Sequence, residues 1–135
     1  MNVFEDLEAD PRRGAAVAVG VLTVVSGLFL LAFPKTALGL IGAGKADPAP
    51  YLFGIIGMFM LLFGGLLIDT ARRLEPSPVA LFWCMLQKIG ATIAMVVGYF
   101  TDVYGWFALF VAIVDGASAL IIRALWRREA MRQGP

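Results

Sequence analysis

Four long apolar segments, separated by shorter polar ones, dominate the pattern of this chain. They cover about residues 14–33, 51–69, 79–100 and 104–126. A helix of about 20 apolar residues is long enough to cross the hydrocarbon core of a bilayer. Each segment is therefore predicted to be a transmembrane helix. Together they predict an all-α fold, a bundle of four transmembrane helices in a single domain.

The polar segments set the limits of this domain. Residues 1–13 are expected to form a solvated polar segment, with a short interfacial helix as the alternative, and residues 127–135 form a basic tail. The connection 34–50 is predicted to hold a short interfacial helix from near Thr36, because irregular backbone is not tolerated against lipid; a re-entrant segment is the alternative. The acidic start differs from the basic start of a signal peptide, so the first span is expected to stay in the membrane.

Basic residues are unevenly distributed between the two ends of the predicted helices. Eight lie before the first helix, between the second and third helices, and from the end of the fourth helix onwards. Only Lys35 and Lys45 lie in the two opposite connections. Because basic residues accumulate on the cytoplasmic side of membranes, both termini are predicted to be cytoplasmic.

The composition agrees with a membrane protein and argues against several functions. Of the 135 residues, 60% are hydrophobic and 16% are charged, against about 45–50% and 25% in soluble domains. The basic residues form no continuous stripe, so no nucleic-acid partner is expected. With no histidine and a single cysteine, Cys84, the chain lacks the usual ligand sets for zinc and haem. Neither a metal site nor an intrinsic cofactor is predicted.

Small residues follow one face of each of the first two predicted helices. In lipid, helices associate by close packing, which small residues permit. The first two helices are therefore expected to form an antiparallel hairpin. The predicted packing residues are Ala16, Gly20, Thr23, Gly27, Gly54, Gly57, Gly64 and Gly65.

An acidic residue ends the second predicted helix. Asp69 precedes Arg72 and Arg73 by three and four residues. On a helix, this spacing supports ion pairs. A structural ion pair is expected there, at the membrane interface.

The third and fourth predicted helices each carry one charge near the middle. Lys88 lies fourteen residues before the predicted turn near Asp102, and Asp115 lies thirteen residues after it. At about 1.5 Å per residue, both reach the same depth. An uncompensated charge at the bilayer centre costs about 2.5–3.5 kcal/mol, so the two are predicted to pair.

Three polar residues lie close to these charges in the sequence. Gln87 and Thr92 are expected to complete the hydrogen bonding of the pair. Ser118 is a small, weakly polar neighbour of Asp115 that leaves room for the long lysine side chain. These three residues are the predicted support of the Lys88–Asp115 pair.

The pair has a structural role or a functional one. Buried polar groups fix helix register in some proteins, and this role is favoured. Alternatively, the pair anchors the head group of a lipid or quinone, or marks a transport pathway for protons or a substrate. Four helices are too few for the usual enclosure of retinal, so that role is excluded. Small multidrug transporters share the size and helix count, but they carry an essential glutamate in a first helix that here has no charge.

Three features of the apolar spans occur together. The first span ends at Phe33-Pro34, the second contains GIIGMFMLLFGG, and the last two carry the single charges Lys88 and Asp115. In these features most of the chain resembles the DoxX-like group of small bacterial four-helix membrane proteins. The resemblance implies a bacterial plasma (inner) membrane protein that acts as a subunit or partner of a membrane redox system. It transfers no functional residue to this chain.

Taken together, the sequence predicts a non-catalytic integral membrane protein. The expected role is that of an accessory or assembly subunit of a larger complex. The expected partners are membrane lipids and either other membrane-protein subunits or further copies of the chain. Binding of a lipid or quinone is the alternative, and transport through Lys88 and Asp115 is less favoured.

Overall fold

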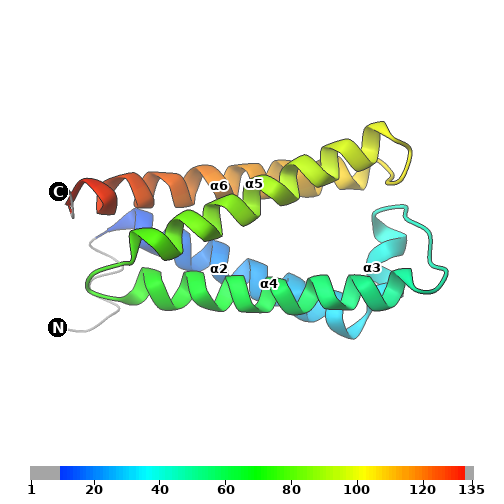
Figure 1. Ribbon diagram of the computed structural model, residues 1–135, viewed down its shortest axis with the longest axis horizontal. Helices are drawn as coiled ribbons and strands as arrows, with labels where there is room; N and C mark the ends of the chain where they lie inside the picture. The colour runs from blue at the N-terminus through cyan, green and yellow to red at the C-terminus, as the bar shows by residue number, and fades with distance from the viewer. Residues whose placement is uncertain (1–9, 133–135) are drawn as a thin grey trace.

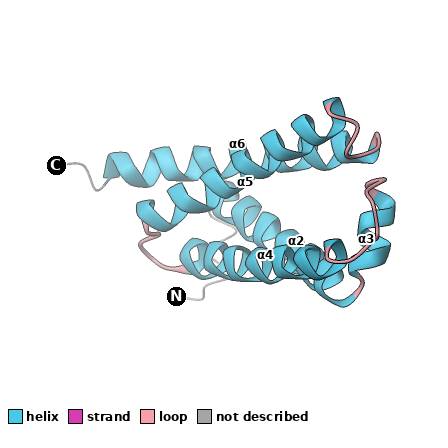
Figure 2. Cartoon of the chain, turned by 45° about the vertical axis from the view of Figure 1, so that its right-hand side comes forward, coloured by secondary structure: helices cyan, strands magenta, loops and turns pink. Residues whose placement is uncertain are grey.

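The computed structural model describes residues 10–132, and within this range it consists of helices and the turns that join them. Four of the helices are long and apolar enough to cross a membrane, which confirms the all-α prediction and its four spans (Figures 1 and 2). The fifth is a short helix in the first connection. In chain order the helices are α2 (Pro11–Ala32), α3 (Pro34–Leu40), α4 (Ala49–Arg72), α5 (Pro78–Phe100) and α6 (Phe107–Arg132).

Most helix ends differ from the predicted bounds, by one to six residues, and two of the differences have a clear consequence. Helix α2 begins at Pro11 and not at residue 14, because the Asp10 side chain accepts a hydrogen bond from the Arg12 backbone N–H and Pro11 occupies the first helical position. Both features are favourable at a helix start. Helix α6 continues to Arg132, so most of the predicted tail is helical. The predictions for residues 1–9 lie outside the described residues.

The short helix α3 confirms the prediction of a helix in the first long connection. It begins at Pro34, two residues before the predicted start. Proline favours the first position of a helix and cannot continue a preceding one, so Pro34 separates α3 from α2. Figure 1 shows α3 at the end of the molecule opposite the start of α2, turned away from the direction of the long helices.

The four long helices form two hairpins, α2 with α4 and α5 with α6, and each is packed more extensively within itself than against the other. The glycines of α2 and α4 bring the two backbones together. A Cβ atom added to Gly27 would lie 2.7 Å from the Gly57 carbonyl oxygen, and one added to Gly64 would lie 2.9 Å from that of Gly20. Such distances leave no room for a side chain, in agreement with small-residue packing in lipid.

Two of the predicted packing glycines are not part of this contact. A Cβ atom added to Gly54 or Gly65 would have no neighbour within 4 Å. Successive residues of a helix point about 100° apart, so Gly64 and Gly65 cannot both face α2. Ala16 and Thr23 are buried as expected; Ala16 belongs to a hydrophobic core, and the Thr23 hydroxyl donates to the Val19 carbonyl.

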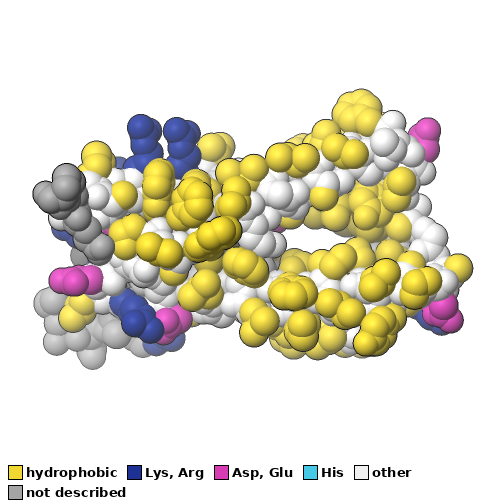
Figure 3. Space-filling view, viewed as in Figure 1, with side chains coloured by type: hydrophobic (Ala, Val, Ile, Leu, Met, Phe, Trp, Pro, Cys, Tyr) yellow, Lys and Arg dark blue, Asp and Glu magenta, His cyan; other side chains and the backbone are white. Residues whose placement is uncertain are grey.

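The two hairpins are joined by two separate hydrophobic cores. The main core lies toward the end where α2 begins and α6 ends, and the small core lies at the opposite end around α3. Between the cores, Figure 3 shows a hollow between the hairpins with hydrophobic side chains on both sides. The main core consists of Ala16, Val19, Leu67, Ala71, Leu81, Cys84, Met85, Ile122 and Leu125, and the small core of Ala37, Leu38, Ile41 and Phe53.

A backbone hydrogen bond also joins the hairpins beside the small core. The Gly105 N–H, in the turn between α5 and α6, donates to the Ile41 carbonyl over 2.6 Å. Gly42 has a positive φ of 71°, a conformation that glycine adopts without strain. An added Cβ there would lie 2.9 Å from the Gly105 nitrogen. The chain therefore needs glycine at position 42 for both its conformation and its contact.

Candidate functional site

Lys88 of α5 and Asp115 of α6 form an ion pair between the two helices. The Lys88 Nζ atom lies 2.7 Å from Asp115 Oδ1. The two side chains are only 7% and 13% exposed. A hydrogen bond between two charged groups at this distance is among the strong ones in proteins, and each charge is compensated inside its own hairpin.

The turn between α5 and α6 brings the two charges to the same level. Asp102 has a positive φ of 57°, and the backbone N–H groups of Val103 and Tyr104 both donate to the Gly98 carbonyl. The Tyr104 ring packs against Gly98, where a side chain would collide with it. This compact turn fixes the register of the hairpin, and the register places Lys88 opposite Asp115.

The supporting polar residues act differently from what the sequence suggested. The Thr92 hydroxyl donates to the Lys88 carbonyl over 2.9 Å and lies 3.4 Å from the Ala112 carbonyl. The Ser118 hydroxyl donates to the Val114 carbonyl. Within residues 10–132, no hydrogen bond joins Gln87 to the pair. The expectation that Gln87 and Thr92 complete its hydrogen bonding is therefore wrong. Short hydroxyl side chains on helices, such as that of Thr92, reach the carbonyl one turn back, and Gln87 points about 100° away from the adjacent Lys88.

The pair lies one helical turn from the main core. Cys84, one turn before Lys88, belongs to that core, and its Sγ atom lies 3.7 Å from the Phe63 carbonyl of α4. Gly116 follows Asp115 and faces Thr92, whose side-chain atoms would lie 3.7 Å from an added Cβ. Small residues around the pair thus leave space for the lysine side chain to reach across.

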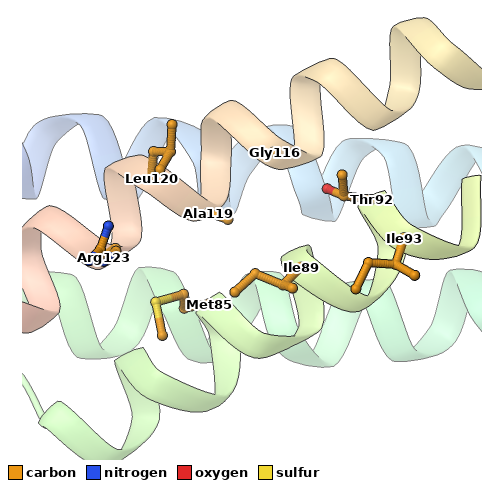
Figure 4. Close-up of a pocket in the computed structure, with 8 residues that line it drawn as sticks. All are labelled: Met85, Ile89, Thr92, Ile93, Gly116, Ala119, Leu120 and Arg123. Carbon is orange, nitrogen blue, oxygen red and sulfur yellow. The ribbon is translucent and has the colours of Figure 1, made fainter. Parts of the chain in front are cut away.

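A groove runs along the hairpin beside the pair. It measures about 360 Å³, and Figure 4 shows its lining residues on α5 and α6. Neither Lys88 nor Asp115 lines it. The two charged side chains are directed at each other and do not open into this groove. The lining residues are Met85, Ile89, Thr92, Ile93, Gly116, Ala119, Leu120 and Arg123.

A second group of charges, which the sequence did not predict, joins the helix ends near the main core. The Asp10 carboxylate forms an ion pair with Arg128 of α6, and it lies 3.7 Å from the Arg13 guanidinium. Arg13 is 8% exposed and donates to the Arg73 and Leu74 carbonyls over 3.0 and 2.8 Å. These contacts tie the start of α2 to the end of α6 and to the turn between α4 and α5.

No local signal in the sequence could have revealed this group. Asp10 and Arg128 are 118 residues apart, and Arg13 is 60 residues from Arg73. Spacing rules for helices relate residues three or four positions apart. The arginines therefore served only to predict the membrane orientation and gave no indication of their partners.

The predicted interfacial ion pair at the end of α4 is formed in part. Arg73 donates to the Asp69 carboxylate over 2.7 Å, and the two side chains are 64% and 59% exposed. Within the described residues, Arg72 forms no ion pair with Asp69. The pair lies at the surface, where ion pairs contribute little to stability.

The candidate site thus consists of a closed charge pair, a groove beside it and a charged group at the helix ends. Among residues 10–132, no three His, Cys, Asp or Glu side chains lie close enough together to hold a metal ion. No protein-family model, curated protein or solved structure matches the chain. The length and composition of its helices indicate that the chain is a small helical membrane protein with several candidate membrane spans.

Proposed function

We propose that the chain is a non-catalytic accessory or assembly subunit that packs a transmembrane helix of a partner protein against the open side of the hollow between its two hairpins. The hollow between the main and small cores carries this proposal (Figure 3). Hydrophobic side chains border the hollow on both hairpins. Helices in lipid associate through van der Waals contact, and a surface that is concave offers more of this contact to a helix than a convex one does.

Lys88 and Asp115 contact each other and do not line the groove beside them, which supports a structural role for the pair. Each charge has the other as its partner at 2.7 Å. A group that anchors a ligand or carries protons must exchange that partner during its function. We therefore assign the pair to the register of the α5–α6 hairpin, which forms one wall of the hollow. An accessory role is also what the resemblance to DoxX-like proteins implies.

Extraction from native membranes in a mild detergent tests the proposal. We expect the chain to copurify in a fixed ratio with another integral membrane protein, and a chain that remains alone at all concentrations and salt conditions would contradict it. A complex made only of copies of this chain would replace the partner by a homo-oligomer and reject an accessory role.

Bound quinone or lipid in the hollow is the competing proposal. Mass spectrometry of the purified protein distinguishes it, because a stoichiometric quinone would identify the hollow as a ligand site. A partner helix and a quinone would compete for the same space. Recovery of the partner complex without stoichiometric quinone favours the accessory role.

Transport is tested separately through the charge pair. We expect proteoliposomes containing the protein to show no proton or substrate flux above that of empty liposomes. Flux that is lost in Lys88→Met and Asp115→Asn would contradict the structural assignment, because ionisable residues in a transport pathway are required for the flux.

A further inference from the structure

The groove on the α5–α6 hairpin has a chemical polarity along its length (Figure 4). Its lining is apolar from Ile93 to Leu120 apart from Thr92, and Arg123 lies at one end. A smaller groove of about 160 Å³ continues from there, lined by Leu120, Arg123, Ala124 and Arg127. The two grooves share Leu120 and Arg123, so together they form one continuous groove that is apolar along most of its length and ends at Arg123 and Arg127. No acidic residue lines either groove.

The groove extends from Ile93, about 7.5 Å beyond the level of the charge pair, to the head groups of the leaflet that holds Arg123 and Arg127. Taking the level of Asp115 as the middle, Arg123 is eight residues away along α6, or about 12 Å, and Arg127 is about 18 Å away. Half of the hydrocarbon core is about 15 Å thick. The aliphatic part of the groove therefore lies at the depth of the acyl chains. Arg127 lies at the depth of the head groups, and Arg123 lies about 3 Å inside the hydrocarbon core, from where its long side chain can reach them.

Both arginines are available to a ligand. Arg123 and Arg127 are exposed and form no ion pair or side-chain hydrogen bond within residues 10–132. The neighbouring Arg128 and Arg132 differ, because they pair with Asp10 and Glu129. The guanidinium group binds phosphate oxygens in a two-pronged geometry, and residues four positions apart on a helix lie on the same face.

We infer that this groove binds one anionic phospholipid, with an acyl chain along Ile89, Ile93 and Leu120 and the phosphate between Arg123 and Arg127. The predicted orientation places the arginines at the cytoplasmic leaflet, where anionic lipids attract basic residues. The site is distinct from the hollow between the hairpins, so this inference does not depend on the proposed accessory role.

Native mass spectrometry of the whole chain in non-ionic detergent tests the inference. The probes are phosphatidylglycerol and phosphatidylcholine with the same acyl chains, and glycerol phosphate, which has the head group without the chains. We expect one tightly held phosphatidylglycerol, and at least about tenfold weaker binding of each other probe. Phosphatidylcholine keeps the phosphate but brings a choline cation close to the two arginines, and glycerol phosphate lacks the acyl-chain contacts with the groove.

Three variants locate the site. The double variant R123Q/R127Q should weaken phosphatidylglycerol binding about tenfold or more, whereas R72Q, which removes an exposed arginine outside the groove, should leave it unchanged. Gly116→Leu fills the groove without changing the charge and should weaken binding of the same lipid. Thermal unfolding of each variant without added lipid checks that the variant is folded.

The inference fails on any of three results. Equal binding of phosphatidylcholine would show that charge is not recognised. Equal weakening by R72Q would show a diffuse attraction to all surface arginines. Undiminished phosphatidylglycerol binding by R123Q/R127Q would place the lipid elsewhere on the protein.

Discussion

Lys88 and Asp115 show how two charges are accommodated inside apolar helices. Each side chain is almost completely removed from solvent and directs its charge at the other. Removing both charges from water costs more than their attraction returns in many proteins, but removal of one partner alone is much worse. The stability of the hairpin therefore depends on the pair being complete, and this asymmetry can be measured.

Single and double substitutions of the pair should be strongly non-additive. We expect Lys88→Met or Asp115→Asn alone to lower the free energy of unfolding by about 3–5 kcal/mol, because each leaves an unpaired buried charge. The double variant should lose less than either single variant. Unfolding in detergent, followed by circular dichroism, measures the three values. Additive losses would show that the two side chains do not interact.

The pair was predictable because it depends on local information. The lengths of two apolar runs and the turn between them give its depth, and the cost of a charge in lipid gives the reason for pairing. Gln87 was assigned a role on proximity alone. Its contacts depend on side-chain direction, which spacing along the sequence does not determine.

At the scale of the helices, glycine determines how closely α2 and α4 approach. The backbone contacts of Gly20 with Gly64 and of Gly27 with Gly57 leave no space for a methyl group. Periodicity indicated that α4 has a glycine-rich side, but not its rotation about the helix axis. Gly64 was therefore placed correctly, and the adjacent Gly65 was not.

The adjacent glycines of α4 provide a matched comparison. Gly64→Ala should destabilise the protein by about 1–3 kcal/mol, as overpacking does in closely packed interiors, because the new methyl would lie 2.9 Å from the Gly20 carbonyl oxygen. Gly65→Ala meets no atom within 4 Å and should have little effect or be slightly stabilising. Thermal unfolding in one detergent compares them. Equal losses would contradict the packing described.

The connection at Gly42 should be similarly intolerant. Gly42→Ala introduces a side chain at positive φ, which costs about 1–2 kcal/mol, and places it 2.9 Å from the Gly105 nitrogen. Gly44→Ala in the same connection, where an added Cβ has no neighbour, is the control. Faster hydrogen exchange at the Gly105 N–H in Gly42→Ala alone would report the loss of its bond to Ile41. Identical exchange in both variants would argue against the contact.

For the whole molecule, the helix ends near the main core are held by charges as well as by apolar contacts. Asp10 pairs with Arg128 across the molecule, and Arg13 reaches the carbonyls at the end of α4. Sequence patterns predicted the helices, since these depend on composition along the chain; the orientation stays a prediction. Contacts between residues 60 or 118 positions apart depend on how the hairpins meet, which no pattern in one sequence determines.

Removing the charge of Asp10 should weaken the contact between the two hairpins at the end near the main core. In Asp10→Asn the helix cap is retained, because asparagine caps as well as aspartate, but the charge facing Arg13 and Arg128 is lost. We expect a loss of about 1–3 kcal/mol, as for hydrogen bonds to charged groups. Asp69→Asn, in the exposed pair with Arg73, should cost less than about 1 kcal/mol. Chemical unfolding compares the two variants, and equal losses of stability would contradict a role for Asp10 in holding the hairpins together.

The location of both charges in one hairpin has a consequence for biosynthesis. Since α5 and α6 are consecutive along the chain, Lys88 and Asp115 can neutralise each other as soon as the second of these helices leaves the translocon. The first hairpin carries no comparable charge in its apolar spans and needs only close glycine contacts. Each half of the protein can thus enter the bilayer as a neutral unit, and assembly of the halves can follow insertion as a separate step.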